Sequence, residues 1–233
     1  MKKCKSIFIA LIFVFSNLSA FAHSHQEDDL GLWINNNISL PITEKIYTGF
    51  QISPRFLDNI TNISQFILHS KIGYKVNENL SIWQGHAWSN TYIPRIRREQ
   101  RIYQDIILEK EFSKLRLENR IRLDERFIQN AGSFSFRPRY RLKASFPFGK
   151  NKDWSIVAFD ELFVNLTSSE SGPQRGVDQN RMYVGLRKEI SRNIAVEGGY
   201  QLQHINSPAP KIDKFNHFIL FKFDILLPQL IKN

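Results

Sequence analysis

Charged and apolar residues alternate along the stretch LRLENRIRLDERF, residues 115–127, and this alternation limits what the chain can fold into. A helix turns about 100° per residue and would scatter the charges around its whole circumference, leaving no apolar stripe. A strand points successive side chains to opposite faces. The stretch is therefore predicted to be a β-strand. One face carries Arg116, Glu118, Arg120, Arg122, Asp124 and Arg126, and the other carries Leu115, Leu117, Ile121, Leu123 and Phe127.

Ten further segments are predicted to be strands, and several sort their residues in the same way. Most of the eleven are 11 to 15 residues long, whereas strands of soluble domains usually have about 5 to 6 residues. A tilted strand needs about 9 to 11 residues to cross a bilayer. The predicted strands are 30–40, 45–56, 64–76, 80–92, 98–112, 115–127, 134–148, 154–166, 177–190, 194–206 and 215–225.

The connections between these strands alternate in length. Short ones at 41–44, 77–79, 113–114, 149–153 and 191–193 alternate with longer ones at 57–63, 93–97, 128–133, 167–176 and 207–214. Short turns on one rim and longer loops on the other are typical of bacterial outer-membrane barrels. We therefore predict an all-β fold, a single antiparallel transmembrane β-barrel of about 10 to 12 strands with a polar, charged lumen.

The strand count raises a difficulty, because bacterial outer-membrane barrels normally have an even number of strands. Eleven segments imply that one is misassigned, or that residues 23–29 run through the lumen or belong to a further strand. Ten and twelve strands both fit the sequence.

The first 22 residues are predicted to be a cleaved signal peptide. Lys2, Lys3 and Lys5 form a basic start, residues 6–15 are apolar, and residues 19–22 (SAFA) resemble a cleavage site. Residues 23–233 then form the barrel. The single cysteine, Cys4, lies in the signal, so disulfides and thiolate chemistry are excluded from the mature chain.

The charged strand faces are predicted to line the lumen. They are rich in arginine and carry both signs, and the planar guanidinium suits ion pairs held in a confined space. The alternative is a soluble barrel with these faces on its exterior. The predicted lumen residues are Arg101, Arg116, Glu118, Arg120, Arg122, Asp124, Arg126, Arg137, Arg139, Arg141, Glu161, Gln179, Arg181, Glu197 and Gln203. Glu125 has the opposite parity, and we expect it to point outward near the end of its strand.

The order of several segments resembles an outer-membrane β-barrel family catalogued as domain of unknown function 2490. The resemblance rests on NLSIWQGHAW, RREQRIYQDI, RLENRIRLDERF, FRPRYRLKASFP, AFDELFVNL, DQNRMYVGL, VEGGYQLQH and FNHFILFKF, and it covers residues from about 33 to 223. It implies an outer-membrane barrel in a Gram-negative bacterium, without an established activity. The tail 226–233 departs from the family by running past the expected final aromatic residue, which could weaken recognition by the barrel-insertion machinery.

Catalytic motifs give no support for an enzyme. Outer-membrane phospholipases and lipid A deacylases resemble one another in carrying His-x-Ser on one strand, and this chain has no such motif. His86 and Ser89 are three residues apart and point to opposite faces. Asp160 and Glu161 are neighbours on a strand and also diverge, so a luminal ion pair is the favoured role for Glu161.

The sequence gives little support for nucleic-acid or metal binding. Recognition sheets for RNA need aromatic and basic side chains on the same face, whereas here they fall on opposite faces, so no nucleic-acid partner is expected. Cleavage after Ala22 would begin the mature chain with His23, Ser24 and His25, and the terminal amine, two amides and the imidazole of a histidine in third place can bind Cu(II) or Ni(II) in a square plane. An exposed acidic tail without metal is the favoured interpretation, and no cofactor is expected.

The sequence thus predicts an outer-membrane protein that is structural or forms a narrow, anion-preferring pore screened by Arg120, Arg122, Arg139, Arg141 and Arg181. The formal net charge of +10 favours anionic surroundings. The expected partners are outer-membrane lipids, the barrel-insertion machinery and small anions. Two alternatives remain open, an outer-membrane lipid-modifying enzyme and a secreted soluble barrel that binds a ligand.

Overall fold

Eleven β-strands lie within the described part of the computed structural model, which comprises residues 28–93, 95–132, 134–169, 171–207 and 213–231. The predicted signal peptide (1–22), His23 and His25 lie outside the described residues. The strands are β1 (Asp28–Pro41), β2 (Ile46–Leu57), β3 (Asn62–Lys75), β4 (Leu80–Thr91), β5 (Arg97–Phe112), β6 (Leu115–Ile128), β7 (Ser135–Phe148), β8 (Trp154–Asn165), β9 (Gly176–Glu189), β10 (Ile194–Ile205) and β11 (Lys214–Leu226).

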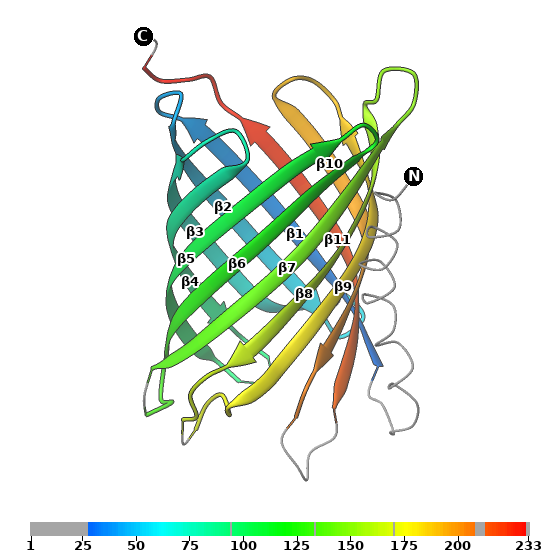
Figure 1. The fold of residues 1–233 in the computed structure, drawn as a ribbon. Helices are drawn as coiled ribbons and strands as arrows, with labels where there is room; N and C mark the ends of the chain where they lie inside the picture. Colours follow the sequence, from blue (N-terminus) through cyan, green and yellow to red (C-terminus); the bar gives the residue numbers. More distant parts are fainter. Residues whose placement is uncertain (1–27, 94, 133, 170, 208–212, 232–233) are drawn as a thin grey trace, which may run out of the picture.

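The strands close into a barrel in chain order, and β1 pairs with β11 to complete the ring (Figure 1). Consecutive strands are antiparallel, but β1 and β11 run in the same direction over a register from Asp28↔Phe215 to Ser39↔Leu226. The predicted all-antiparallel pairing is therefore wrong at this seam. An odd number of hairpin-linked strands brings the first and last strands into parallel alignment, so closure requires one parallel pair.

Among the described residues the strand count is odd, and residues 28 and 29 of the uncertain segment belong to β1, whereas residues 23–27 lie outside the described residues. All eleven predicted segments are strands, and none was misassigned. Odd membrane barrels exist, since a mitochondrial barrel has 19 strands.

The C-terminal tail continues along β1 after β11 ends. Leu227 N donates to Ser39 O at 2.8 Å, Leu230 N to Pro41 O at 3.0 Å, and Ile231 N to Ile42 O at 3.0 Å. The tail that departs from the family pattern is thus hydrogen-bonded to the end of β1 and to the turn that follows it.

The connections gather at two rims. The short-turn rim comprises 42–45, 76–79, 113–114, 149–153 and 190–193, and the long-loop rim comprises the described residues of the connections 58–61, 92–96, 129–134, 166–175 and 206–213. The connection expected at 57–63 is shorter than predicted. Asp58, Asn59 and Ile60 adopt positive φ angles of 56°, 52° and 69°, and this left-handed turn lets β2 and β3 pair almost to their ends.

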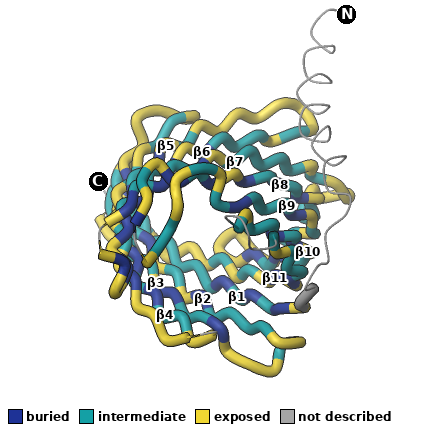
Figure 2. The backbone as a smooth tube through the Cα atoms, turned by 90° about the horizontal axis from the view of Figure 1, so that it is seen from below, coloured by how far each residue is buried: buried dark blue, intermediate teal, exposed yellow. Residues whose placement is uncertain are grey.

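The two faces of the barrel differ in chemistry, as β6 shows. Arg120, Arg122 and Asp124 are buried on the inner face, whereas Ile121 and Phe127 are 56% and 46% exposed on the outer face. Buried and exposed positions alternate along the strands around the ring (Figure 2). The outer face is therefore the more apolar one.

Aromatic side chains form two rows on the outer face. Near the long-loop rim, Phe66 contacts Trp88, and Phe134 lies between Phe127 and Phe136, with ring centroids 5.1 to 6.5 Å apart. Near the short-turn rim, the centroids of Phe148 and Trp154 are 6.4 Å apart, and Tyr74 and Phe146 are exposed. Aliphatic side chains occupy most of the surface between the rows.

The interior is not uniformly polar. A buried apolar cluster comprises Trp33, Val157, Phe159, Tyr183, Phe218 and Leu220. A second cluster contains Tyr103, which fills space left by Gly85 on the neighbouring strand, because a Cβ at Gly85 would overlap the tyrosine ring. The predicted charged lumen is thus only part of the interior, and aromatic side chains line the rest.

No helix in the described ranges is long and apolar enough to cross a bilayer.

Candidate functional site in the charged interior

A cavity of about 710 Å3 occupies the barrel interior. Its lining includes Ser39 and Gly49 near the short-turn rim, and Thr91 and Arg97 near the long-loop rim. The cavity therefore extends along most of the barrel. It is the geometric feature of the described residues that is best placed to hold or pass a small molecule.

Two carboxylates of β5 hold arginines of β5 and β6. Asp105 accepts two hydrogen bonds from Arg122, Nε to Oδ1 and Nη2 to Oδ2, both 2.6 Å long. Glu99 accepts from Arg101 and from Arg126, each with an Nε–Oε1 distance of 2.6 Å. These residues occupy every second position on β5 and β6, so their side chains share the inner face of the barrel.

A second network crosses β6 to β9. Arg139 donates to Glu161, with an Nη2–Oε1 distance of 2.6 Å, and Arg120 donates to the same carboxylate oxygen. Arg137 lies between two carboxylates, 2.9 Å from Asp124 and 3.0 Å from Asp178. Charge-assisted bonds of this kind are stronger than neutral ones, so the network should hold this wall rigidly.

A third group lies toward the short-turn rim. Arg141 donates to Glu118, and Lys222 Nζ is 2.5 Å from Glu197. Arg187 binds Asp224, and its Nε lies 2.7 Å from Glu189. Carboxylates thus neutralise many of the interior cations.

Twelve of the fifteen predicted lumen residues lie on the cavity wall: Arg101, Arg120, Arg122, Arg126, Arg137, Arg139, Arg141, Glu161, Gln179, Arg181, Glu197 and Gln203. Asp124 is buried against Arg137, and Glu118 is bound to Arg141, so both belong to the interior networks without lining the cavity. Arg116 lies at the short-turn rim. Its side chain is 57% exposed and 3.6 Å from Glu111.

Comparison with known proteins gives a family but no activity. A family model described as "Protein of unknown function (DUF2490)" matches residues 30–216. The chain belongs to the DUF2490 family. An uncharacterized protein of Methylorubrum extorquens is 32% identical to this DUF2490 chain over 200 residues, which span 83% of this chain and 86% of that protein. No solved structure matches this DUF2490 chain.

Four cations on the cavity wall of the DUF2490 barrel have no carboxylate within 4.0 Å among the described residues: Arg55, Lys71, Arg97 and Arg181. Sequence reasoning identified only Arg181. Gln51, Ser53 and Arg55 share one parity on β2, so the alternation could have placed Arg55 inside.

Aromatic rings take the place of carboxylates at Arg55, Lys71 and Arg181. The guanidinium carbon of Arg55 is 3.8 Å from the centroid of the Trp33 ring, and that of Arg181 is 4.8 Å from the same centroid. The ammonium of Lys71 is 4.3 Å from the centroid of Trp83. Cation–π contacts partly offset the cost of removing these charges from water.

Residue pairs that would suggest catalysis do not converge in the DUF2490 barrel. His86 points outward and bonds Gln100 at 2.7 Å, whereas Ser89 is buried and accepts a bond from Gln65 at 2.9 Å. Asp160 accepts from Asn180 at 2.8 Å, and the neighbouring Glu161 takes part in the interior network. Within the described ranges, no group of three or more acidic, histidine or cysteine side chains could hold a metal ion.

Glu125 lies on the outer face of β6, three residues before the strand ends at the long-loop rim. Its Oε1 accepts a hydrogen bond of 3.2 Å from Gln104, which in turn lies 3.3 Å from Gln84. A short row of polar side chains therefore interrupts the apolar outer surface across β4, β5 and β6.

Proposed function

We propose that this DUF2490 chain is an outer-membrane β-barrel of a Gram-negative bacterium and that its interior is a narrow, anion-preferring pore. One observation carries the membrane part of the proposal: the barrel exposes isoleucine, leucine and phenylalanine outside while its ion pairs lie inside. A soluble barrel has the opposite arrangement, and an apolar outer face with a polar interior suits lipid. The outer-membrane lipids are the partners of that face.

The two aromatic rows support the same proposal through their spacing. Phe136 and Phe146 are ten residues apart on β7. This corresponds to about 33 Å along the strand at about 3.3 Å per residue. At a tilt of about 40°, the separation along the barrel axis is about 25 Å, the height of the apolar band in outer-membrane barrels.

The charge of the cavity wall supports the preference for anions. The wall carries thirteen lysine and arginine residues but only five aspartate and glutamate residues. Three further carboxylates do not line the cavity but form ion pairs with arginines that do: Asp105, Asp124 and Glu118. Cations remain in excess when these three are included. A pore lined by excess arginine and lysine favours anions.

The size of the barrel supports a narrow passage. Barrels of about eight strands are filled by side chains, and open aqueous channels come with 16 to 18 strands. Eleven strands fall between these limits. Ion pairs and aromatic rings would restrict passage further, so small anions are the proposed permeants.

Two experiments test the proposal. Heat-modifiability on a gel combined with membrane fractionation tests the location: we expect a band that shifts on boiling and partitions with the outer membrane. Recovery in the soluble periplasmic fraction would instead favour a secreted ligand-binding barrel.

Planar bilayers containing the purified protein test conduction, and we expect small currents with a reversal potential shifted toward that of chloride in a salt gradient. An absence of current, or cation preference, would reject the pore.

A further inference from the structure

We propose that Arg55 and Arg181 form a binding site for one small oxyanion inside the barrel, with its carboxylate or phosphate group bridging the two guanidinium groups. The inference deepens the proposed anion-preferring pore by naming where an anion is held. Binding can be measured without any current, so the two proposals can fail independently.

The first argument is that both arginines reach the same aromatic ring from different strands. Arg55 comes from β2, next to Trp33 of β1 in register, and Arg181 comes from β9. Since both guanidinium carbons lie within 4.8 Å of the Trp33 centroid, their separation cannot exceed the sum of the two centroid distances. The two guanidinium carbons are therefore no more than 8.6 Å apart (3.8 Å plus 4.8 Å), and both contact one ring.

The second argument is that neither arginine has an acidic partner within the described ranges. Glu161 is the register neighbour of Arg181, but its carboxylate binds Arg120 and Arg139. Arg55 donates from Nη1 to the neutral amide oxygen of Gln65 at 2.9 Å. An anion would supply the missing negative charge.

The third argument comes from buried donors without acceptors. Nε of Arg55 and Nε of Arg181 are buried, and neither has a hydrogen-bond partner. Nε2 of Gln201, on the same cavity wall, is in the same state. Buried donors are rarely left unsatisfied, so each of these three groups calls for an acceptor on the cavity side.

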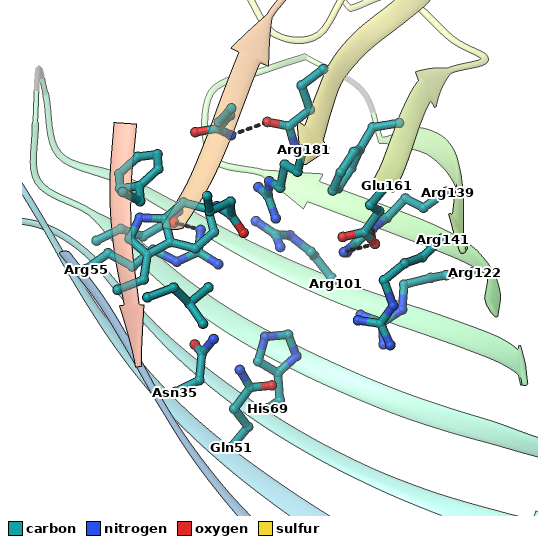
Figure 3. Close-up of a pocket in the computed structure, with 18 of the residues that line it drawn as sticks. Asn35, Gln51, Arg55, His69, Arg101, Arg122, Arg139, Arg141, Glu161 and Arg181 are labelled. Atoms are coloured by element: carbon teal, nitrogen blue, oxygen red, sulfur yellow. Dashed lines mark hydrogen bonds and ion pairs between the residues drawn. The ribbon is translucent and has the colours of Figure 1, made fainter. Parts of the chain in front are cut away.

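The surroundings leave room for such an acceptor. Figure 3 shows Arg55, Arg101 and Arg181 directed toward a common space within the cavity, with Asn35, Gln51 and His69 grouped lower in the view on the same cavity wall. Trp33 and Phe163 present ring faces to the arginines, since the guanidinium carbon of Arg181 is 4.5 Å from the Phe163 centroid. The planar guanidinium fork matches carboxylate and phosphate in a bidentate manner.

Titration calorimetry on the mature barrel in detergent micelles, with inorganic phosphate and separately with benzoate, tests the site. We expect the unmodified chain to bind at least one of the two anions. Arg55→Gln and Arg181→Gln should each weaken binding by tenfold or more, because each removes one charge-assisted partner. Arg181→Lys, which keeps the charge and loses the fork, should weaken it less. Tighter binding of phosphate than benzoate would identify a phosphate group as the ligand, and the reverse a carboxylate.

The matched control is Arg116→Gln, which removes an arginine at the rim and should leave affinity unchanged. Every variant must keep its heat-modifiable gel band, and anion-dependent thermal protection provides a second readout that a purely structural role would not give. Equal affinity in Arg55→Gln, Arg181→Gln and the unmodified chain would overturn the site, as would no binding of either anion. Binding without current would overturn only the pore, and current without binding only the site.

Discussion

Both carboxylate oxygens of Asp105 accept hydrogen bonds from Arg122, whose guanidinium carbon also lies 3.9 Å from the centroid of the Tyr103 ring. Asp105 is 2% exposed and Arg122 is 7% exposed. The pair therefore joins β5 to β6 as a buried ion pair at the cavity wall, with an aromatic ring against the cation. Removing one partner of such a buried pair costs stability, because the remaining charge is left buried without a counter-charge, even where forming the pair adds little net stability.

Asp105→Asn should destabilise the barrel, because it leaves the Arg122 charge buried without its partner. We expect a loss of about 3–5 kcal/mol in the free energy of unfolding, the range found when one member of a buried pair is removed. Urea unfolding in micelles, followed by the heat-modifiable band, measures it. Glu111→Gln is the control, since the Glu111–Arg116 pair is exposed and 3.6 Å apart, and it should have little effect. Equal midpoints for the two variants would show that the interior pair is not buried as described.

Ile121→Arg tests whether the outer face meets lipid. Ile121 is 56% exposed on the outer face, midway along β6, and a charge there should cost about 2–4 kcal/mol if that face lies in a bilayer. Folding into lipid vesicles at increasing urea concentration measures the cost. Ile190→Arg is a matched control, because Ile190 is also 56% exposed but lies in the turn after β9. If the two substitutions cost the same, the membrane proposal loses its main support.

Arg181→Gln should lower the anion preference of any current, because it removes a cation that no carboxylate neutralises among the described residues. The reversal potential in a potassium chloride gradient reports the change. Arg141→Gln combined with Glu118→Gln removes a bound cation and its carboxylate together and should leave the preference unchanged. A larger shift in the double variant would mean that net interior charge does not set selectivity.

Paired cysteines test the parallel seam. Ile38→Cys with Ile225→Cys should form a disulfide on mild oxidation, because these residues are register partners and neighbouring strands are about 4.8 Å apart. Ile38→Cys with Phe215→Cys, close to the pairing that antiparallel closure would bring together, should not cross-link. Altered gel mobility in the absence of reductant detects the bond. A cross-link in the second pair alone would contradict closure by β1 and β11 as described.

The strands themselves could be predicted from the sequence because alternation is a local property. Leu115–Phe127 was predicted as a strand, and β6 covers Leu115–Ile128. The same local rule assigned Arg120, Arg122 and Arg139 to one face, and all three lie on the cavity wall. Loop lengths are predictable from the sequence to within one residue, except at the turn of Asp58, Asn59 and Ile60, where three successive left-handed residues shorten the connection.

The sequence by itself thus determined that the chain forms long strands with two chemically distinct faces, because side-chain direction in a strand depends only on position. Only the tertiary structure decided how the ring closes, which acid neutralises which arginine, and which cations are left over. Those outcomes depend on the register of strands far apart in the chain. Trp33 illustrates the point. Pairing of β1 with β2 places Arg55 beside its ring, whereas Arg181 of β9 reaches the same ring only because β1 closes onto β11.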